Sequence, residues 1–375
     1  MKPQISVHAK DLQSVNNMLY ELTCLRRWSE VTVEGGKYTE LGKQALNSMI
    51  AYFWAIEAKH EGAYVNLNQF PKLAIYRGFT KVYQCDVPEM NLDAIFELGN
   101  VSRDSFQQMI DAEIAKITSE GFRHLLAVDP SCLEASIFKA ATKVATLLEL
   151  EDIKNGISKR DYNLKKKQLE DNISGFSYLP GYKKILSEEY LQVFRDYSQL
   201  RNRIRWAKHP NIIKCGVLGH HFDVAVFSYL MSLEVYPSNE DLATHYFFIG
   251  IFHDFPERWT GDMPSPIKDS IPGLRQATEE FENRVMEENV YSLLPTYQQT
   301  ALKAVMLEDE ANVHLKKFSK KSDNYLAFIE CWRELDSGSR HSYYKTVFNR
   351  DYEKKEKLPE NFRLLAEVLY RNLFG

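Results

Sequence analysis

The sequence predicts an all-α protein made of two similar helical bundles in tandem. Apolar residues recur at helical spacing through most of the chain. A segment of the first half also aligns without gaps on a segment of the second half. The length of 375 residues exceeds what one hydrophobic core usually supports. We therefore expect one bundle over residues 1–190 and another over residues 191–375.

Four stretches of the first half have the apolar periodicity of amphipathic helices. They are Leu12–Leu25, Leu46–Ala58, Asp104–Thr118 and Ala135–Leu150. Residues 31–37 contain two adjacent glycines and predict an extended segment with a turn. Residues 154–177 are charged and weakly patterned, which predicts a linking or inserted segment.

The second half shows the same preference for helices. Tyr246–Phe252 is an apolar run long enough for a buried helix. His220 and His221 precede one amphipathic stretch, and Asp323 precedes another. We expect these polar residues near helix starts, where their side chains can converge on a cleft.

Three pairs of segments repeat in nearly constant register, at offsets of 176, 178 and 179 residues. The pairs are Ile75–Pro88 with Ile251–Pro264, Arg27-Trp28 with Arg205-Trp206, and Leu179-Pro180 with Leu358-Pro359. Chance similarity among helices of like composition is the alternative. The constant register favours an internal duplication.

The stretch 253–264 combines two adjacent metal-type ligands, His253 and Asp254, with the carboxylates of Glu257 and Asp262. A histidine and an aspartate at the end of an apolar helix are costly to desolvate, and a bound cation would compensate them. An ordinary helix-cap pair is the alternative for His253 and Asp254 alone. Glu257 would share a helix face with Asp254 if the helix continues.

The aligned positions of the first half lack these ligands. Arg77-Gly78 replaces the His-Asp pair, and Lys81 replaces the glutamate. Arginine and lysine do not ligate cations, so the first bundle is expected to be metal-free. Arg77 and Lys81 are then either spare charges in a vestigial pocket or surface residues, and we favour the second. The two bundles are expected to pack as an intrachain pseudo-twofold pair.

The order of His220, His253-Asp254 and Asp323 resembles the HD-domain metal-dependent phosphohydrolases, and more narrowly the YfbR-like bacterial 5'-deoxynucleotidases. The shared pattern is Arg-Trp, a histidine fifteen residues after that arginine, HD-x-x-E-x-x-x-G-D-x-P, and an aspartate followed after three residues by an Ala-aromatic pair. The resemblance covers roughly residues 200–340. This chain has Gly219 and His221 where the family has glutamate and serine, so His221 stays an alternative ligand to His220.

The resemblance implies a role for each residue of the pattern. One divalent ion (Mn, Co, Fe, Ni or Zn) would be held by His220, His253, Asp254 and Asp323. Glu257 would orient or deprotonate the attacking water, and Asp262 would act near the leaving oxygen or the sugar. Arg205 would clamp the phosphate, and Trp206 would line the sugar pocket. Taken singly, each residue has a structural alternative. Asp323 could be a helix cap, and Trp206 could be an ordinary core residue.

The implied activity is removal of phosphate from (deoxy)nucleoside 5'-monophosphates. A dNTP triphosphohydrolase and a non-catalytic nucleotide-sensing or scaffold protein are the alternatives. The net charge of -4 argues against bulk nucleic-acid binding. No apolar run is long enough for a membrane span, and the N-terminus lacks the apolar core of a signal peptide. Five scattered cysteines without a CxxC pair fit a reducing compartment, so we expect a cytoplasmic protein. The expected partner is a nucleotide substrate. A homo-oligomer beyond the intrachain pair is left open.

Overall fold

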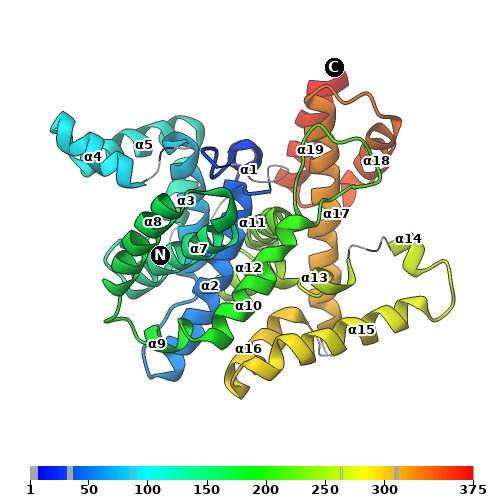
Figure 1. Cartoon of the computed structure of the whole chain (residues 1–375). Helices are drawn as coiled ribbons and strands as arrows, with labels where there is room; N and C mark the ends of the chain where they lie inside the picture. The colour runs from blue at the N-terminus through cyan, green and yellow to red at the C-terminus, as the bar shows by residue number, and fades with distance from the viewer. Residues whose placement is uncertain are drawn as a thin grey trace.

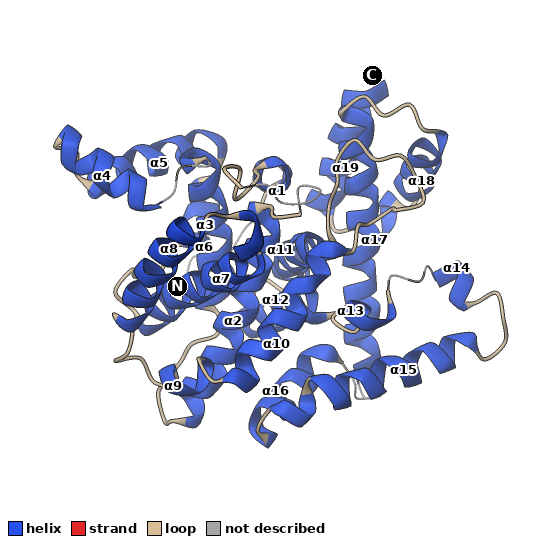
Figure 2. Cartoon of the chain, in the orientation of Figure 1, coloured by secondary structure: helices blue, strands red, loops and turns tan. Residues whose placement is uncertain are grey.

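The computed structural model describes residues 7–31, 37–85, 87, 89–261, 263, 265–307 and 312–374. Within these ranges the regular secondary structure is helical, apart from two isolated β-bridges, so the predicted all-α class is confirmed (Figures 1 and 2). No helix in the described ranges is long and apolar enough to span a membrane.

The N-terminal half contains ten α-helices among its described residues. They are α1 (Ala9–Cys24), α2 (Glu40–His60), α3 (Gln69–Gln84), α4 (Glu89–Gly99), α5 (Arg103–Ile117), α6 (Glu120–Leu126), α7 (Leu133–Asp152), α8 (Lys159–Ser174), α9 (Tyr182–Ile185) and α10 (Glu188–Ser198). The four helices expected from apolar periodicity correspond to α1, α2, α5 and α7. Their starts follow residues that cap the first backbone N–H groups, as Thr39 does for α2 and Ser102 for α5.

The C-terminal half has nine α-helices where the structure describes it. They are α11 (Val217–Val235), α12 (Glu240–Phe252), α13 (Glu257–Thr260), α14 (Ser265–Lys268), α15 (Leu274–Asn289), α16 (Thr296–Met306), α17 (Val313–Asp336), α18 (Ser342–Tyr352) and α19 (Glu360–Phe374). The apolar run 246–252 forms the end of α12, as expected.

Two expectations about the first half need comment. Most of residues 154–177, where the sequence predicts a linking or inserted segment, forms the helix α8, which Ser158 caps. The helix lies on the surface and buries few side chains, which explains its weak pattern. Tyr162 and Leu169 of α8 pack on a small cluster separate from the main core. Of the expected turn at 31–37, residues 32–36 lie outside the described part of the chain.

The polar residues of the second half lie inside helices rather than before them. His220 and His221 are in the first turns of α11, and Asp323 is near the middle of α17. The sequence pattern missed the start of α17 because its first ten residues are mostly polar. Without a helix breaker between residues 313 and 323, the helix begins well before its apolar part.

α11 lies at the centre of the molecule. Most of its side chains are buried, as expected for a helix that is apolar on all sides. It packs against α12 and α17 of its own half and against α2 of the other half (Figure 1). Gly250 of α12 is the point of closest approach, since a Cβ there would lie 2.5 Å from Cα of Ala225.

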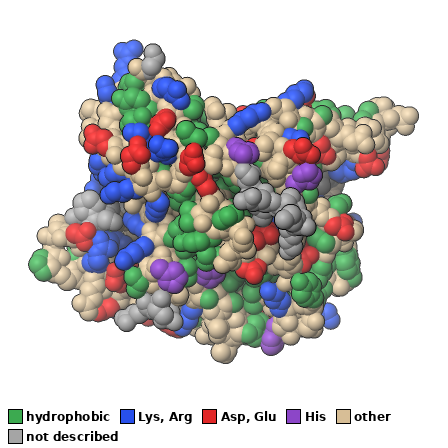
Figure 3. Space-filling view, turned by 180° about the vertical axis from the view of Figure 1, so that it is seen from behind, with side chains coloured by type: hydrophobic (Ala, Val, Ile, Leu, Met, Phe, Trp, Pro, Cys, Tyr) green, Lys and Arg blue, Asp and Glu red, His purple; other side chains and the backbone are tan. Residues whose placement is uncertain are grey.

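One continuous hydrophobic core runs through both halves, from α1 to α19. The α4–α5 pair and the α14–α15 pair project from opposite sides of this body in Figure 1. Acidic and basic side chains both occur across the face shown in Figure 3.

Candidate active site

The first feature of the candidate site is a group of three histidines, two of them fully buried, at two adjacent helices. His220 and His221 come from α11, and His253 follows the last residue of α12. The ring centroids of His220 and His221 lie 5.4 and 4.8 Å from that of His253. The close packing of α11 and α12 at Gly250 therefore positions the three imidazoles.

Each histidine has its Nδ1 atom engaged by the protein. Nδ1 of His220 lies 3.0 Å from Oε1 of Glu330, and Nδ1 of His253 lies 2.8 Å from the carbonyl oxygen of Gly250. Both partners only accept hydrogen bonds, so both Nδ1 atoms carry the proton. Nδ1 of His221 lies 3.1 Å from the hydroxyl of Tyr197, whose own proton goes to the carbonyl of Ile251. The third imidazole therefore also donates from Nδ1.

This tautomer leaves a lone pair on Nε2 of all three rings. The three Nε2 atoms are buried and make no hydrogen bond of good geometry in the described residues, although those of His220 and His253 lie within ion-pair distance of a carboxylate. Buried polar atoms normally make hydrogen bonds, so three such atoms without one in the same place call for an explanation. Histidines that ligate metals show this arrangement, with the outer nitrogen held by a carboxylate or carbonyl.

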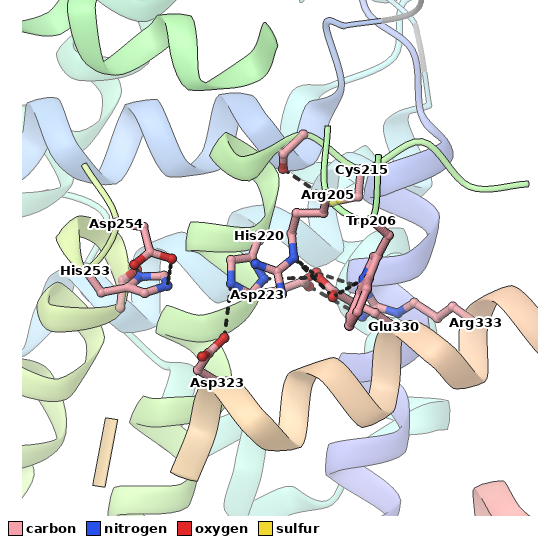
Figure 4. A network of polar contacts seen from close by, with 12 residues as sticks. Arg205, Trp206, Cys215, His220, Asp223, His253, Asp254, Asp323, Glu330 and Arg333 are labelled. Carbon is pink, nitrogen blue, oxygen red and sulfur yellow. Dashed lines mark hydrogen bonds and ion pairs between the residues drawn. The ribbon is translucent and has the colours of Figure 1, made fainter. Parts of the chain in front are cut away.

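Two carboxylates complete the group. Oδ1 of Asp323 lies 3.4 Å from Nε2 of His220, and Oδ2 of Asp254 lies 3.1 Å from Nε2 of His253 (Figure 4). Ligand atoms fall within 4.8 Å of one another in two overlapping sets, which share His253. One set adds His220 and Asp323, and the other adds His221 and Asp254. The four predicted ligands thus lie together, and His221 lies with them.

Charges in the cluster shift the pKa values of its members. Burial opposes ionisation of Asp254, but His253 outweighs it and lowers the pKa of that carboxyl. Burial likewise opposes ionisation of Asp323, and His220 with Lys320 holds its pKa well below the usual range. Burial and Arg205 lower the pKa of His220, yet Glu330 and Asp323 leave it raised overall. A divalent cation would displace that proton from His220, as metal binding usually does.

Arg205 and Trp206 lie on the Glu330 side of the cluster, away from His253 (Figure 4). Nε of Arg205 and the indole N–H of Trp206 both donate to Oε2 of Glu330, at 3.2 and 2.9 Å. The indole ring packs edge-on against Tyr343 of α18. Glu330 therefore connects the arginine, the tryptophan and His220.

The remaining two predicted residues follow the His-Asp pair. The helix does not continue from Asp254 to Glu257: α12 ends at Phe252, and α13 begins at Glu257 after a turn. The condition for a shared helix face is therefore not met, because the chain bends where His253 and Asp254 turn into the cluster. The side chain of Glu257 is buried. Asp262 lies outside the described residues.

Sequence reasoning did not identify Glu330 or Tyr197. Glu330 follows Asp323 by seven residues, which is two helical turns, so both project from one face of α17. That spacing could have revealed Glu330 once Asp323 was chosen. Tyr197 is far from α11 in sequence, and no local pattern marks it.

The Glu330 contacts have a counterpart in the N-terminal half. Nε of Arg27 and the indole N–H of Trp28 both donate to Oε2 of Glu149, each at 3.0 Å. Trp28 and Trp206 also share a left-handed backbone, with φ of 59° and 57°. Such a conformation is uncommon for a bulky residue.

The C-terminal half is similar to a known family. Residues 192–369 match the family described as 5'-deoxynucleotidase YfbR-like. A 5'-deoxynucleotidase of Vibrio atlanticus (strain LGP32) is 25% identical over 141 residues, which is 37% of this chain and 72% of the relative. One from Pasteurella multocida (strain Pm70) is 28% identical over 152 residues, or 39% of this chain and 76% of the relative. No solved structure gives a significant match.

Proposed function

We propose that this chain removes the phosphate of (deoxy)nucleoside 5'-monophosphates with a divalent metal ion, because residues 192–369 match the family described as 5'-deoxynucleotidase YfbR-like. The observation that carries the proposal is the convergence of three histidine Nε2 atoms with two carboxylates in one place. The relatives named 5'-deoxynucleotidase support the choice of substrate.

The donor set fits a divalent ion. His220, His253, Asp254 and Asp323 would hold it, with His221 as a neighbouring donor. Imidazoles and carboxylates suit Mn, Co, Fe, Ni or Zn, and these ligand types do not choose among them. When bound, such an ion supplies Lewis-acid activation of a water near neutral pH and offsets phosphate charge.

The other residues would bind the substrate and move protons. Arg205 binds the phosphate, since its planar guanidinium suits two phosphate oxygens at once. Glu257 accepts a proton from the water that attacks phosphorus, and the bond from phosphorus to the 5'-oxygen breaks. Asp262 is assigned to the leaving oxygen. Trp206 is assigned to the sugar, because it shares the Glu330 carboxylate with Arg205.

Phosphate release from dAMP by the purified full chain with Mn or Co tests this proposal. We expect release by the wild type and none above background by Asp254→Ala. Asp336→Ala, an exposed carboxylate at the end of α17, is the matched control and should keep full activity. Equal activity of Asp254→Ala and the wild type would refute the assignment.

The same assay separates the alternatives. A triphosphohydrolase would release inorganic triphosphate from dATP and would leave dAMP intact. A nucleotide-sensing protein would bind nucleotide under several metals without turnover. A phosphomonoesterase would release orthophosphate from dAMP.

The organisation of the chain is part of the proposal. We assign residues 1–190 to a degenerate HD-like bundle and residues 191–375 to the catalytic bundle, related by duplication. The paired Arg-Trp-Glu contacts of Glu149 and Glu330 support this relation. The packing of α2 on α11 supports an intrachain pseudo-dimer.

A further inference from the structure

His221 is a fully buried histidine of the cluster to which the family resemblance gives no role. The family has a serine at this position, whereas this chain has a second histidine directly after His220. Adjacent residues of a helix project about 100° apart, so their side chains normally face different surroundings. Here both rings lie beside His253, with centroids 5.4 Å from it for His220 and 4.8 Å for His221.

Tyr197 of α10 holds the ring of His221 in one tautomer. The Tyr197 hydroxyl lies 3.1 Å from Nδ1 of His221 and donates its own proton to the carbonyl oxygen of Ile251, at 2.7 Å. The tyrosine is fully buried, and its ring packs edge-on against Phe255 at a centroid distance of 5.2 Å. Packing therefore fixes the hydroxyl, which keeps the proton of His221 on Nδ1 and a lone pair on Nε2.

Nε2 of His221 is buried and makes no hydrogen bond in the described residues. Ligand atoms of His221, His253 and Asp254 lie within 4.8 Å of one another. A core histidine with a purely structural role is expected to bond through both nitrogens, because a buried acceptor without a hydrogen bond is costly. A cation held among these three groups would be the partner of Nε2.

The two overlapping ligand sets describe one ion rather than two. Both sets include His253. Its Nδ1 is bonded to the carbonyl oxygen of Gly250, so only Nε2 is available to a cation. An imidazole nitrogen has a single lone pair and does not bridge two cations. His220 and His221 would therefore contribute to the same ion.

The first half offers no competing metal site in the part of the chain that the structure describes, since neither ligand set includes a residue from it. Arg77 and Lys81 take the aligned positions and line an N-terminal cavity of about 160 Å³. Lys81 is only 8% exposed, so the expectation that both are simply surface residues is wrong. We therefore expect one bound ion per chain.

We propose that His221 is a fifth protein ligand of the divalent ion and that it sets the metal preference of this chain. The proposal rests on the metal-dependent function given above and deepens it. Three imidazoles and two carboxylates provide more nitrogen than the four ligands that the resemblance implies. Imidazole suits Ni and Zn, whereas oxygen ligands suit Mn. The additional histidine raises the preference for Ni or Zn over Mn.

Competition titrations of the full chain with Ni, Zn and Mn, without substrate, test the proposal. His221→Ser should weaken Ni binding by about tenfold or more and Mn binding by less, since even a residue behind a ligand is worth about 10–100-fold. X-ray absorption of the zinc-loaded protein should show three imidazoles in the wild type and two in His221→Ser. His245→Ser, on a partly buried residue of α12 that belongs to neither set, is the control and should change no affinity.

Tyr197→Phe tests the same ligand without replacing it. The substitution keeps the ring and removes the hydroxyl behind Nδ1 of His221, so Ni binding should weaken by about tenfold or more. Tyr190→Phe is the matched control on α10, because Tyr190 is equally buried but its hydroxyl donates to Glu57. Urea denaturation of each metal-free variant checks that it folds.

The outcomes separate this inference from the proposed function. A Ni-to-Mn preference that His221→Ser and Tyr197→Phe leave unchanged would overturn the inference, even if both variants were less stable, and would mark His221 as an ordinary core residue. Two ions bound per chain would also overturn it. A wild type that binds no divalent ion would refute the proposed function as well. The expected metal preference without release of phosphate from dAMP would contradict the proposed function alone.

Discussion

Glu330 is the residue on which three others of the candidate site depend. Its carboxylate receives the Nδ1 proton of His220 and also binds Arg205 and Trp206. Arg205 and His220 lower the pKa of Glu330 to about 2 against the opposing effect of burial, so the group is ionised throughout the working range. It therefore holds the ring of His220 in the metal-binding tautomer.

We predict that Glu330→Gln lowers metal affinity by about 10–100-fold, the usual effect of losing a carboxylate behind a ligating histidine. The amide still accepts a hydrogen bond but no longer carries the charge that favours the Nδ1 proton. Titration with Mn or Co measures the effect, and circular dichroism checks the fold. The control Glu353→Gln, on an exposed residue after α18, should not change affinity. An unchanged affinity in Glu330→Gln would contradict the role given to the carboxylate.

Glu40 gives a prediction about pH. Burial opposes its ionisation, but Arg27 and Lys43 lower its pKa from 4.5 to about 2. A carboxyl whose pKa is depressed on folding adds stability above its unfolded pKa, and loses that contribution as the pH falls towards the folded value.

Between pH 5 and pH 2, the free energy of unfolding of the wild type should therefore fall more steeply than that of Glu40→Gln, by on the order of 3 kcal/mol. Urea denaturation at a series of pH values measures this difference. Glu170→Gln, on an exposed residue of α8, should follow the wild type. Parallel curves for the wild type and Glu40→Gln would show that the buried ion pair does not drive acid destabilisation.

Residue identity predicted four ligand candidates that lie together, but not the residues that hold them in place. His220, His253, Asp254 and Asp323 lie together, because their types and order constrain what can share a buried site. The sequence did not identify Tyr197, because only tertiary packing brings its hydroxyl to His221. The sequence can therefore predict candidate metal ligands from residue type and order. The residues that hydrogen-bond to those ligands depend on how the helices pack, which the sequence pattern does not show.

The crossing of α11 and α12 shows how one helix pair sets the geometry of the site. Gly250 allows the two backbones to meet, and its carbonyl accepts the Nδ1 proton of His253. We predict that Gly250→Ala destabilises the protein by about 1–3 kcal/mol, because the added methyl must separate the helices. The same shift should weaken metal binding.

Thermal or urea denaturation together with a metal titration tests this prediction. Gly99→Ala, at the end of α4, is the control, since a methyl there would meet only the side chain of Val101 at 3.4 Å. Normal stability and metal affinity in Gly250→Ala would show that the helices tolerate a wider separation.

The helices differed in how far the sequence could predict them. α1, α2, α5, α7 and the end of α12 have strong apolar periodicity, and all were found. α8 and the first turns of α17 are polar, so their helical state depends on caps and on what they pack against. A pattern based on apolar residues detects buried faces, not helices as such.

The molecule as a whole is held together across its two halves. α2 packs on α11, and Glu57 of α2 accepts hydrogen bonds from Tyr190 of α10 and Tyr297 of α16. Arg333 of α17 binds Asp223 and reaches Asn16 of α1. The two halves therefore share apolar and polar contacts, which the pseudo-dimer expected from the sequence would require.

We predict that residues 191–375 alone do not form a stable, active domain, because removing residues 1–190 exposes the apolar face of α11 that α2 covers. Circular dichroism, cooperative denaturation and dAMP hydrolysis of the fragment measure this. Co-expression of the two fragments should restore activity if they reassemble. A fragment as stable and active as the full chain would show that the first half is dispensable.

Met18 has a consequence for how the N-terminal cavity could change by mutation. A Cβ at Gly78, the position aligned with Asp254, would lie 2.5 Å from the sulfur of Met18. A single Gly78→Asp change would therefore force that side chain aside, and a metal centre would still lack a histidine at position 77. A step back towards a metal site at this position therefore requires the side chain of Met18 to move. The first half can therefore not acquire the metal site proposed for the second by one substitution, since three aligned positions differ and one of them is sterically restricted.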